Sequence, residues 1–233
     1  AVTWYNAPYY ITHLEQLGFQ TEKEYIESTF LVKDVDPEPL YRGEELVKKR
    51  YGVYSKNFDR TADIMPYVDQ MFDLFNESYK NLASFVAVSE RQKEFFKKKY
   101  ISFINPEYIK FVFNSQNQMI AFAIVMPGYA QALQKANGKL FPFGIFHLLK
   151  ARKSSKDAVF YLIGIAPEYQ NKGVTALIMS EFYRTVIKKG VERCIRTPEL
   201  AENQAIHLLW RNFNPKVTAR RKTFSILLEN LKS

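Results

Sequence analysis

The sequence predicts a mixed α+β fold, in which strands and helices alternate along the chain. Apolar residues recur at helical spacing in Ile64–Asn81 and Lys172–Lys189, and strand-forming residues fill Met119–Met126 and Ala158–Ala166. From residue 53 on, the predicted order is strand, two helices, three strands, helix, strand, helix and strand. With 233 residues, of which 47% are hydrophobic, the chain is long enough to bury a substantial core.

The other predicted elements follow from caps, turn residues and β-forming runs. Ser89 and Gln92 form a capping-box pattern, Asn114–Asn117 predicts a tight turn between two strands, and Asp34–Pro39 predicts a linker. Helices are predicted at 8–19, 89–103, 129–135 and 203–212, and strands at 25–32, 53–54, 109–114, 192–197 and 223–228.

A strand that leads through a polar turn into a helix is the most informative segment. Residues 161–166 are apolar, residues 170–172 are polar or cationic, and Val174, Leu177, Ile178 and Phe182 then repeat at helical spacing. The N–H groups in the first turn of a helix lack partners within the helix, and the helix dipole favours an anion there. Gly173 lets the backbone approach a ligand closely. The segment therefore predicts a cradle for pyrophosphate.

The run Gln170-Asn171-Lys172-Gly173-Val174-Thr175-Ala176, preceded by Ile165-Ala166-Pro167, resembles the acyl-CoA-binding signature of the GNAT superfamily of N-acetyltransferases, Gln/Arg-x-x-Gly-x-Gly/Ala. One position departs, because Thr175 stands where that family prefers Gly or Ala. The resemblance implies a mixed, mostly antiparallel central sheet flanked by helices on both faces. It also implies acetyl-CoA or another acyl-CoA as co-substrate and an amine as acceptor.

The resemblance also implies a set of cofactor-binding residues. In the family, backbone amides of the strand before the cradle polarise the thioester carbonyl. Gly164 lies within that strand and predicts either a bulge or a close approach of the backbone to the ligand, with local twist of the strand as the alternative. Asn203 begins the last predicted helix, where it is an N-cap, a cofactor contact or both. The implied residues are Ile163, Gly164, Ile165, Gln170, Asn171, Lys172, Gly173, Val174, Thr175, Ala176 and Asn203.

Acid and base groups are less clearly indicated. Glu199 follows the strand at 192–197 and is expected to face the cleft between strands, whereas His207 lies on the last helix, where a single histidine is more often structural. Glu199 is therefore the preferred general base over His207, and transfer through water without a dedicated base is the alternative. Trp210 occupies the position at which many family members place a proton-donating Tyr, and an indole cannot replace it.

A short repeat bears on domain organisation. Leu14-Glu-Gln-Leu-Gly-Phe resembles the end of the last helix of GNAT domains, and a degenerate copy occurs at Trp210-Arg-Asn-Phe-Asn-Pro. We expect residues 1–40 to be the tail of a preceding GNAT-like half, and residues 41–233 to be a GNAT-like acyltransferase domain with an insert at 127–157. The alternative is a first helix and strand that pack on a single domain. The apolar part of the insert predicts either a wall of the acceptor site or an additional core layer.

Charge and composition limit the partners. The formal net charge of +9 permits binding to nucleic acid, to an anionic membrane surface or to an anionic ligand such as CoA. Because no DNA- or RNA-binding motif accompanies the basic clusters, nucleic acid is disfavoured. The longest apolar run, Met119–Met126, is shorter than the roughly 20 residues of a membrane span. The three histidines and the single Cys194 are scattered, so the sequence predicts no metal site. A single cysteine suits the reducing environment of the cytoplasm. The oligomeric state is left open.

Two functions compete on this evidence. The preferred one is an acyl-CoA-dependent N-acyltransferase, in the first place an N-acetyltransferase, that acts on an unidentified amine by direct transfer. The alternative is a catalytically degenerate GNAT-like domain that binds acyl-CoA as a sensor or regulatory module, which Thr175 and Trp210 favour. A nucleic-acid-binding protein is a third hypothesis that rests on charge alone and predicts strongly salt-dependent DNA affinity.

Overall fold

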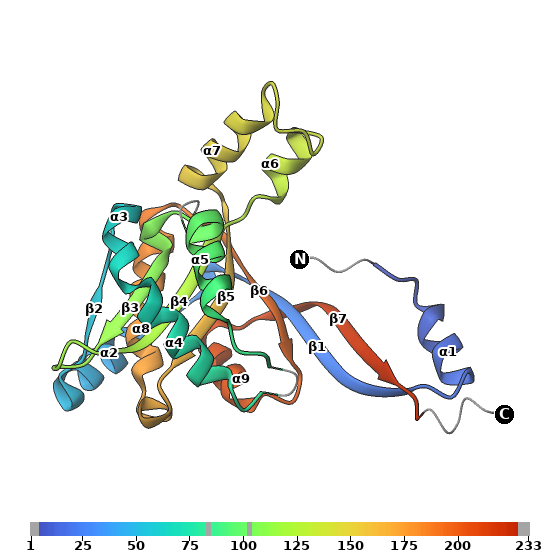
Figure 1. The fold of residues 1–233 in the computed structure, drawn as a ribbon, viewed down its shortest axis with the longest axis horizontal. Coiled ribbons are helices and arrows are strands. Elements are labelled where there is room, and N and C mark those ends of the chain that lie inside the picture. Colours follow the sequence, from blue (N-terminus) through green and yellow to red (C-terminus); the bar gives the residue numbers. More distant parts are fainter. Residues whose placement is uncertain (1–4, 83–84, 102–103, 228–233) are drawn as a thin grey trace. The chain divides into compact units, whose positions relative to one another are not determined.

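The structure, a computed structural model, describes residues 5–82, 85–101 and 104–227. The chain divides into two compact units (Figure 1). The larger unit consists of residues 31–194, and the smaller one combines residues 1–30 with residues 195–233. Each unit buries large aromatic side chains, among them Phe111 and Phe122 in the larger unit and Trp210 and Phe213 in the smaller one.

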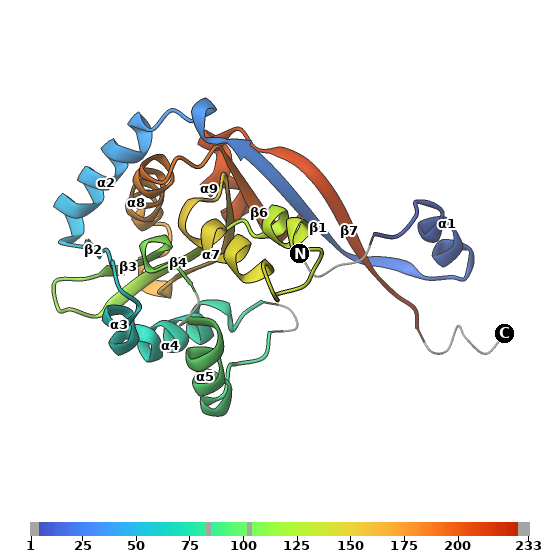
Figure 2. The ribbon, with the colours of Figure 1, turned by 90° about the horizontal axis from the view of Figure 1, so that it is seen from above.

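The larger unit is built around antiparallel strands in the order β2-β3-β4-β5. These strands are β2 (Tyr54–Lys56), β3 (Ile109–Phe113), β4 (Met119–Pro127) and β5 (Asp157–Ile165). Helix α4 (Val68–Tyr79) packs on β4 and β5, whereas α8 (Val174–Lys188) packs on β2, β3 and β4 and is itself covered by α2 (Glu38–Tyr51). Figure 2 shows α2 and α8 on one side of the sheet and α4 on the other. The expected antiparallel sheet with helices on both faces is therefore confirmed.

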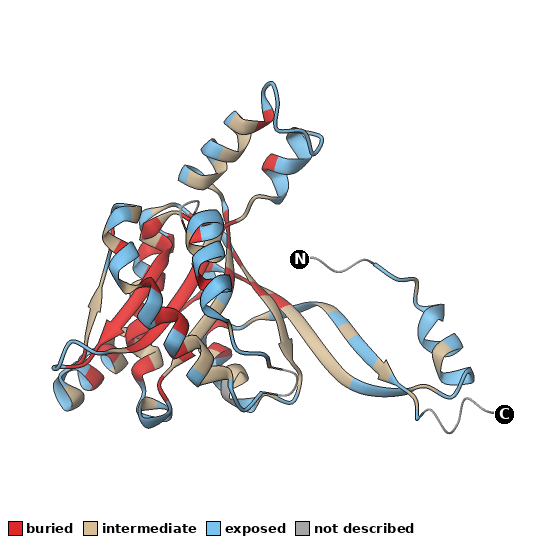
Figure 3. Ribbon diagram, viewed as in Figure 1, coloured by how far each residue is buried: buried red, intermediate tan, exposed pale blue. Residues whose placement is uncertain are grey.

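The core of this unit lies between the sheet and its two layers of helices. Every residue of β3 is buried, as is nearly all of β4 (Figure 3). The four apolar positions predicted to face inward from α8 are at most 1% exposed. They are Val174, Leu177, Ile178 and Phe182. Helical periodicity alone therefore located the buried face of α8 correctly.

Helix α2 was not predicted from the sequence. Its residues are mostly polar, and it contains Pro39 and Gly43, both of which disfavour a helix interior. Pro39 stands in the first turn, where a missing N–H costs nothing, and the left-handed Gly52 ends the helix. Only Leu40, Glu44 and Val47 of α2 are buried. Because only two apolar residues and one carboxylate face inward, α2 lacks the repeating apolar pattern that identifies an amphipathic helix in a sequence.

The predicted helix at 64–81 is interrupted in the structure. It consists of α3 (Thr61–Ile64), a 3-10 turn at Met65–Tyr67 and α4, and Pro66 in the turn lacks the N–H that a continuous helix needs. The capping box at Ser89 and Gln92 is confirmed, and α5 (Glu90–Phe96) continues as a π-helix through Ile101. The last residues of the predicted helix at 89–103 lie outside the described residues.

The insert between β4 and β5 forms a pair of helices. Helix α6 (Ala130–Lys135) agrees with the prediction, and the following apolar run forms α7 (Gly144–Ser154), which packs on α6. Side chains of this run, such as Phe141 and Phe143, are exposed, so they do not form an additional core layer.

The smaller unit combines both ends of the chain. Strand β1 (Gln20–Leu31) pairs antiparallel with β7 (Lys216–Ser225), and within this unit β1 lies between β7 and the part of β6 (Arg193–Leu200) from residue 195 on. The two remaining helices are α1 (Tyr9–Gln16) and α9 (Gln204–Trp210). The strand predicted at 223–228 starts too late, because β7 begins at Lys216 and includes the basic residues Arg220 and Arg221. These arginines pair with Glu24 and Glu27 of β1 at 2.8 and 3.1 Å.

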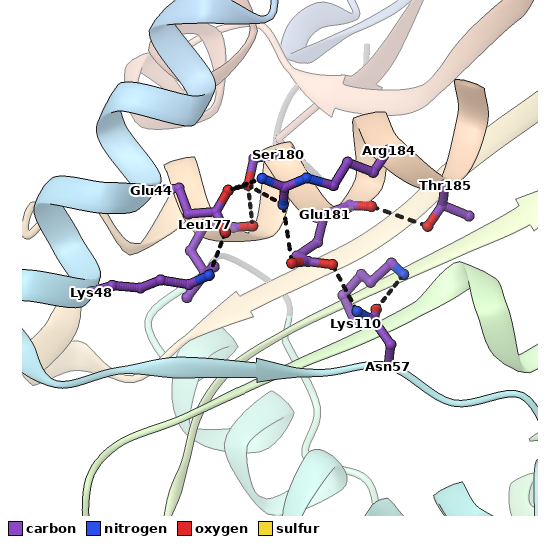
Figure 4. A network of polar contacts seen from close by, with 9 residues as sticks. All are labelled: Glu44, Lys48, Asn57, Lys110, Leu177, Ser180, Glu181, Arg184 and Thr185. Atoms are coloured by element: carbon purple, nitrogen blue, oxygen red, sulfur yellow. Dashed lines mark hydrogen bonds and ion pairs between the residues drawn. The ribbon is translucent and has the colours of Figure 1, made fainter. Parts of the chain in front are cut away.

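The contact between α2 and α8 includes a buried carboxylate (Figure 4). The side chain of Glu44 is 4% exposed, and its Oε2 accepts hydrogen bonds from Ser180 Oγ and from Arg184 Nη2, the latter at 2.6 Å. Lys48 Nζ pairs with its other oxygen. Burial acts to raise the pKa of Glu44, but the hydrogen bonds from Arg184, Lys48 and Ser180 hold it below the ordinary value of 4.5.

Substitution Glu44→Gln is expected to lower the free energy of unfolding at pH 7 by about 2–3 kcal/mol, because Lys48 and Arg184 lose a buried carboxylate, although Arg184 keeps its ion pair with Glu181. The lowered pKa of Glu44 means that its contribution is present above pH 4.5 and is lost as the pH falls through the lowered value. Urea unfolding of both proteins over this pH range measures the difference, which should shrink in acid. The control is Glu45→Gln at an exposed neighbouring position. An equal effect of the two substitutions would contradict the role of Glu44.

Candidate functional site

Strand β5 carries the predicted amide groups and is paired with β4. Gly164 lies opposite Phe122, and a Cβ placed at Gly164 would lie 2.2 Å from Cε1 of the Phe122 ring. The absence of a side chain at Gly164 is therefore required by an aromatic neighbour within the sheet. The irregularity in pairing lies nearer the start of β5, where Ile124 faces Leu162 and Val125 faces Phe160, so that Tyr161 is the extra residue.

The carbonyl groups of β5 receive hydrogen bonds from the end of α4. Tyr79 Oη donates to the carbonyl of Ile163 at 2.9 Å, and Ser78 Oγ donates to that of Ile165 at 3.1 Å. In an antiparallel strand the N–H and C=O of one residue point to the same side. The amides of Ile163 and Ile165 therefore face the side of β5 that does not pair with β4. Sequence analysis missed Ser78 and Tyr79, since their position against β5 depends on the helix packing.

The predicted cradle lies between β5 and α8. The chain makes a 3-10 turn at Pro167–Tyr169, and Asn171 and Gly173 then take left-handed backbone conformations with φ of 60° and 76°. Helix α8 starts at the next residue, so its first-turn N–H groups are presented at the end of this turn. Asn171, Lys172 and Gly173 are exposed. An open turn with left-handed residues at a helix N-terminus is an arrangement that suits an anionic ligand.

The side chains of the cradle have contacts within the chain. Gln170 Nε2 donates to the carbonyl of Ile165 at 3.3 Å, and the Lys172 ammonium lies over the rings of Tyr169 and Tyr51 at 5.0 and 5.6 Å from their centroids. Gln170 therefore ties the turn to the end of β5. Lys172 keeps a cation at the exposed rim, held by aromatic faces.

The small residues of the cradle also serve the packing of α2 on α8. A Cβ placed at Gly43 would lie 2.7 Å from Cβ of Ala176, and one placed at Gly173 would lie 3.2 Å from Val47. The amide of Ala176 donates to the carbonyl of Gly173 at 2.9 Å. Val174 is buried and Thr175 is half-buried, so the departure at Thr175 leaves a partly accessible hydroxyl-bearing side chain in the first turn of α8.

In the smaller unit, Glu199 lies between an arginine and a tryptophan. Trp210 Nε1 donates to Glu199 Oε1 at 3.2 Å, and Arg196 forms an ion pair with the same carboxylate and stacks over the indole, with Cζ 4.9 Å from the ring centroid. Burial raises the pKa of Glu199, although Arg196 and Trp210 act in the opposite direction. A raised carboxyl pKa suits a general base, but the hydrogen bonds from Arg196 and Trp210 occupy the oxygens that would accept a proton.

His207 and Asn203 lie in the same unit. The His207 Nε2 lies 3.0 Å from the carbonyl of Ala201 and donates to it, so Nδ1 is the nitrogen that accepts when the ring is neutral. Asn203 Oδ1 accepts from the amide of Ile206 at 3.3 Å, so the expected N-cap role is confirmed. The structure thus groups Glu199, Asn203 and His207 in the smaller unit and the β5 and cradle residues in the larger one.

Over residues 5–82, 85–101 and 104–227, no group of three or more His, Cys, Asp or Glu side chains is arranged to hold a metal ion. None of the helices in this part of the chain is long and apolar enough to cross a lipid bilayer. Cys194 is buried, and burial raises the pKa of its thiol.

A buried lysine in β3 was not foreseen from the sequence. Lys110 is 3% exposed, and its Nζ donates to Asn57 Oδ1 at 2.7 Å, while the Asn57 amide donates to Glu181 (Figure 4). Burial lowers the pKa of Lys110 to about 8, against the attraction of Glu181 and Glu107. The residue lines a cavity of about 210 Å³ beside α8. In the sequence it stood inside a predicted strand with nothing to show that it is buried.

The wild-type chain is expected to become more stable relative to a Lys110→Met variant as the pH rises from about 8 to 10.5, because the unfolded chain binds this proton more tightly than the folded one. The total change should be on the order of 1–3 kcal/mol. Urea unfolding of both proteins along this pH range measures it, with Lys33→Met at an exposed position as the control. A difference that does not depend on pH would show that Lys110 titrates normally.

Comparisons with known proteins agree on the fold. No family model matches the sequence. Protein YghO of Escherichia coli (strain K12) is 26% identical over 183 residues, which are 76% of this chain and 46% of that protein. The structure resembles a GCN5-related N-acetyltransferase from Sphaerobacter thermophilus with a TM-score of 0.60, at 10% identity over 94% of this chain and 56% of that one.

A tandem GNAT protein from the clavulanic acid biosynthesis pathway gives a similar result. Its TM-score is 0.57 at 10% identity, and the match covers 96% of this chain and 59% of that protein. The chain thus spans about half the length of the proteins it matches. These likenesses establish that the chain has the fold of the GCN5-related N-acetyltransferases, as the cradle motif predicted.

Proposed function

We propose that the chain is an acyl-CoA-dependent N-acyltransferase, and in the first place an N-acetyltransferase, that transfers the acyl group directly to an unidentified amine. The observation that carries the proposal is the exposed turn between β5 and α8, with left-handed Gly173 immediately before the helix N-terminus. Pyrophosphate oxygens bind well to amides at such a turn. The GNAT fold of the chain supports the same conclusion at the level of architecture.

The proposed cofactor-binding residues are the amides of Ile163–Ile165, the turn and first helical residues at 170–176, and Asn203. In the reaction, the amine nitrogen attacks the thioester carbonyl, a C–N bond forms and the C–S bond breaks, the amine loses a proton and the leaving thiolate gains one. The amides of Ile163 and Ile165, on the side of β5 that faces away from β4, are suited to stabilise negative charge on the carbonyl oxygen.

Proton transfer has three candidate groups. The Tyr79 hydroxyl lies 2.9 Å from the carbonyl oxygen of Ile163, beside the strand that would hold the thioester, and is our candidate for protonating the thiolate. Glu199 and His207 remain the candidates for the general base. The raised pKa of Glu199 favours it, and the Nδ1 acceptor of His207 makes it the second choice.

A degenerate domain that binds acyl-CoA without turnover is the second candidate function. It is favoured by the engagement of both Glu199 oxygens with Arg196 and Trp210, which is what a structural carboxylate does. Trp210 is fully buried, so it holds Glu199 in place and donates no proton to a substrate.

The domain organisation belongs to the proposal as well. We infer that residues 1–40 correspond to the end of a GNAT-like half and residues 41–233, with the insert at 127–157, to a second one. In support, Gly18 and Asn214 occupy the same place in the two short repeats, both are left-handed with φ of 85° and 47°, and each precedes a strand. The proposal includes a cytoplasmic location, where the single Cys194 would stay reduced.

Acetyl-CoA is expected to raise the thermal unfolding midpoint of the chain, since a ligand that binds only the folded state stabilises it by about 2.7 kcal/mol at 100 times its Kd. Gly173→Glu should abolish the shift, because it places a carboxylate where the pyrophosphate would lie. The matched control is Gly190→Glu beyond the other end of α8, where φ is 64° and the backbone strain is similar. A shift that both variants retain, or no shift at all, would refute acyl-CoA binding in the cradle.

Glu199→Gln is expected to lower kcat for amine acylation by about 10²–10⁴-fold and to remove an acidic limb from the pH–rate profile. His207→Gln should lower it less. Thiol release with a panel of amines measures the rates, and the exposed Glu202→Gln serves as control. If acetyl-CoA still stabilises every variant but even the wild type releases no thiol with any amine, the sensor alternative replaces the enzyme.

A further inference from the structure

The α6–α7 hairpin exposes a concentration of large apolar side chains. Phe141, Phe143 and Phe146 are 78%, 70% and 64% exposed. Leu140 and Leu149 beside them are 49% and 47% exposed. Figure 1 shows the hairpin projecting from the sheet of the larger unit. Four of these five residues fall within residues 140–146, which lead from the loop after α6 into the first turn of α7. Single exposed apolar side chains are common on protein surfaces, whereas several that lie together usually mark an interaction surface.

The same hairpin is purely basic. No Asp or Glu occurs between Glu107 and Asp157. The stretch from 128 to 156 carries the cations Lys135, Lys139, Lys150, Arg152, Lys153 and Lys156. All of these except Arg152 are exposed. Lys156, beyond the end of α7, pairs with Glu192 at 2.8 Å. The other cations of the segment share it with the apolar residues and with no acidic residue, which favours an anionic partner.

We propose that this hairpin docks the chain on the surface of an anionic lipid bilayer, with the three phenylalanines at the boundary of headgroups and acyl chains and the lysines over the headgroups. The run from Leu140 to Phe146 contains no polar side chain and mixes aliphatic with aromatic residues. Hydrocarbon accepts both kinds of side chain, whereas stacking on single-stranded nucleic acid uses aromatic rings only. The proposal goes beyond acyl transfer and does not depend on it.

The test is co-sedimentation of the full chain with vesicles of phosphatidylcholine alone or of phosphatidylcholine mixed with phosphatidylglycerol. Binding is expected only to the mixed vesicles and should fall with rising salt. The triple variant Phe141→Ser/Phe143→Ser/Phe146→Ser should lose it, and these exposed positions leave the core intact. The matched control is Leu46→Ser/Val86→Ser/Ile187→Ser, at exposed apolar positions elsewhere in the same unit.

Charge is tested separately. Lys139→Gln/Lys150→Gln/Lys153→Gln should weaken binding by about fivefold per lysine. Lys33→Gln/Lys49→Gln/Lys80→Gln, which changes the net charge equally at other exposed positions, should weaken it far less. Equal weakening by the two charge variants would overturn the proposal, as would the absence of binding to mixed vesicles. Phenylalanine-dependent binding to a single-stranded oligonucleotide, or phenylalanine-dependent dimerisation, in place of vesicle binding would overturn it too. The response to acetyl-CoA should be unchanged in every hairpin variant.

Discussion

The packing of α2 against α8 is the constraint on which the candidate cofactor site depends. Gly43 and Val47 of α2 lie against Ala176 and Gly173, so the two helices meet at the residues that shape the cradle. One turn further along α8, the buried carboxylate of Glu44 is held in the same contact by charged and polar donors. Because an uncompensated buried charge is costly, this cluster favours a single register of α2 on α8. The helix N-terminus is thereby fixed relative to β5.

Strand β5 is held from two directions. Phe122 of β4 occupies the space that a side chain at Gly164 would need, and Ser78 and Tyr79 of α4 donate to its carbonyl groups. These contacts keep the amides of Ile163 and Ile165 turned to the side of β5 that faces away from β4. A preorganised row of amides is what stabilises a developing oxyanion at the lowest cost, because no reorientation is needed during the reaction.

Charge has different uses in different parts of the chain. In β1 and β7, arginines and glutamates pair across strands that are too polar to be held by burial. Around Glu199 the charges are partly buried and shift a pKa. On the α6–α7 hairpin the cations have no acidic residue of the same segment to pair with and lie beside exposed phenylalanines. The segment at 128–156, with six cations and no acidic residue, accounts for much of the net charge of +9.

The sequence by itself determined the elements with a clear period and the cradle motif. The buried face of α8, the capping box of α5 and the turn at Asn114–Asn117 all depend on neighbours in the chain, so local pattern suffices. It missed α2, the break at Pro66, the start of β7, the burial of Lys110 and the contact of Gly164 with Phe122. The break at Pro66 follows from a local property, its missing N–H. The other features depend on residues far apart in sequence, such as Gly43 with Ala176 and Gly164 with Phe122. Only the tertiary structure brings such pairs into contact, and contact decides which polar residue is buried and which glycine is required.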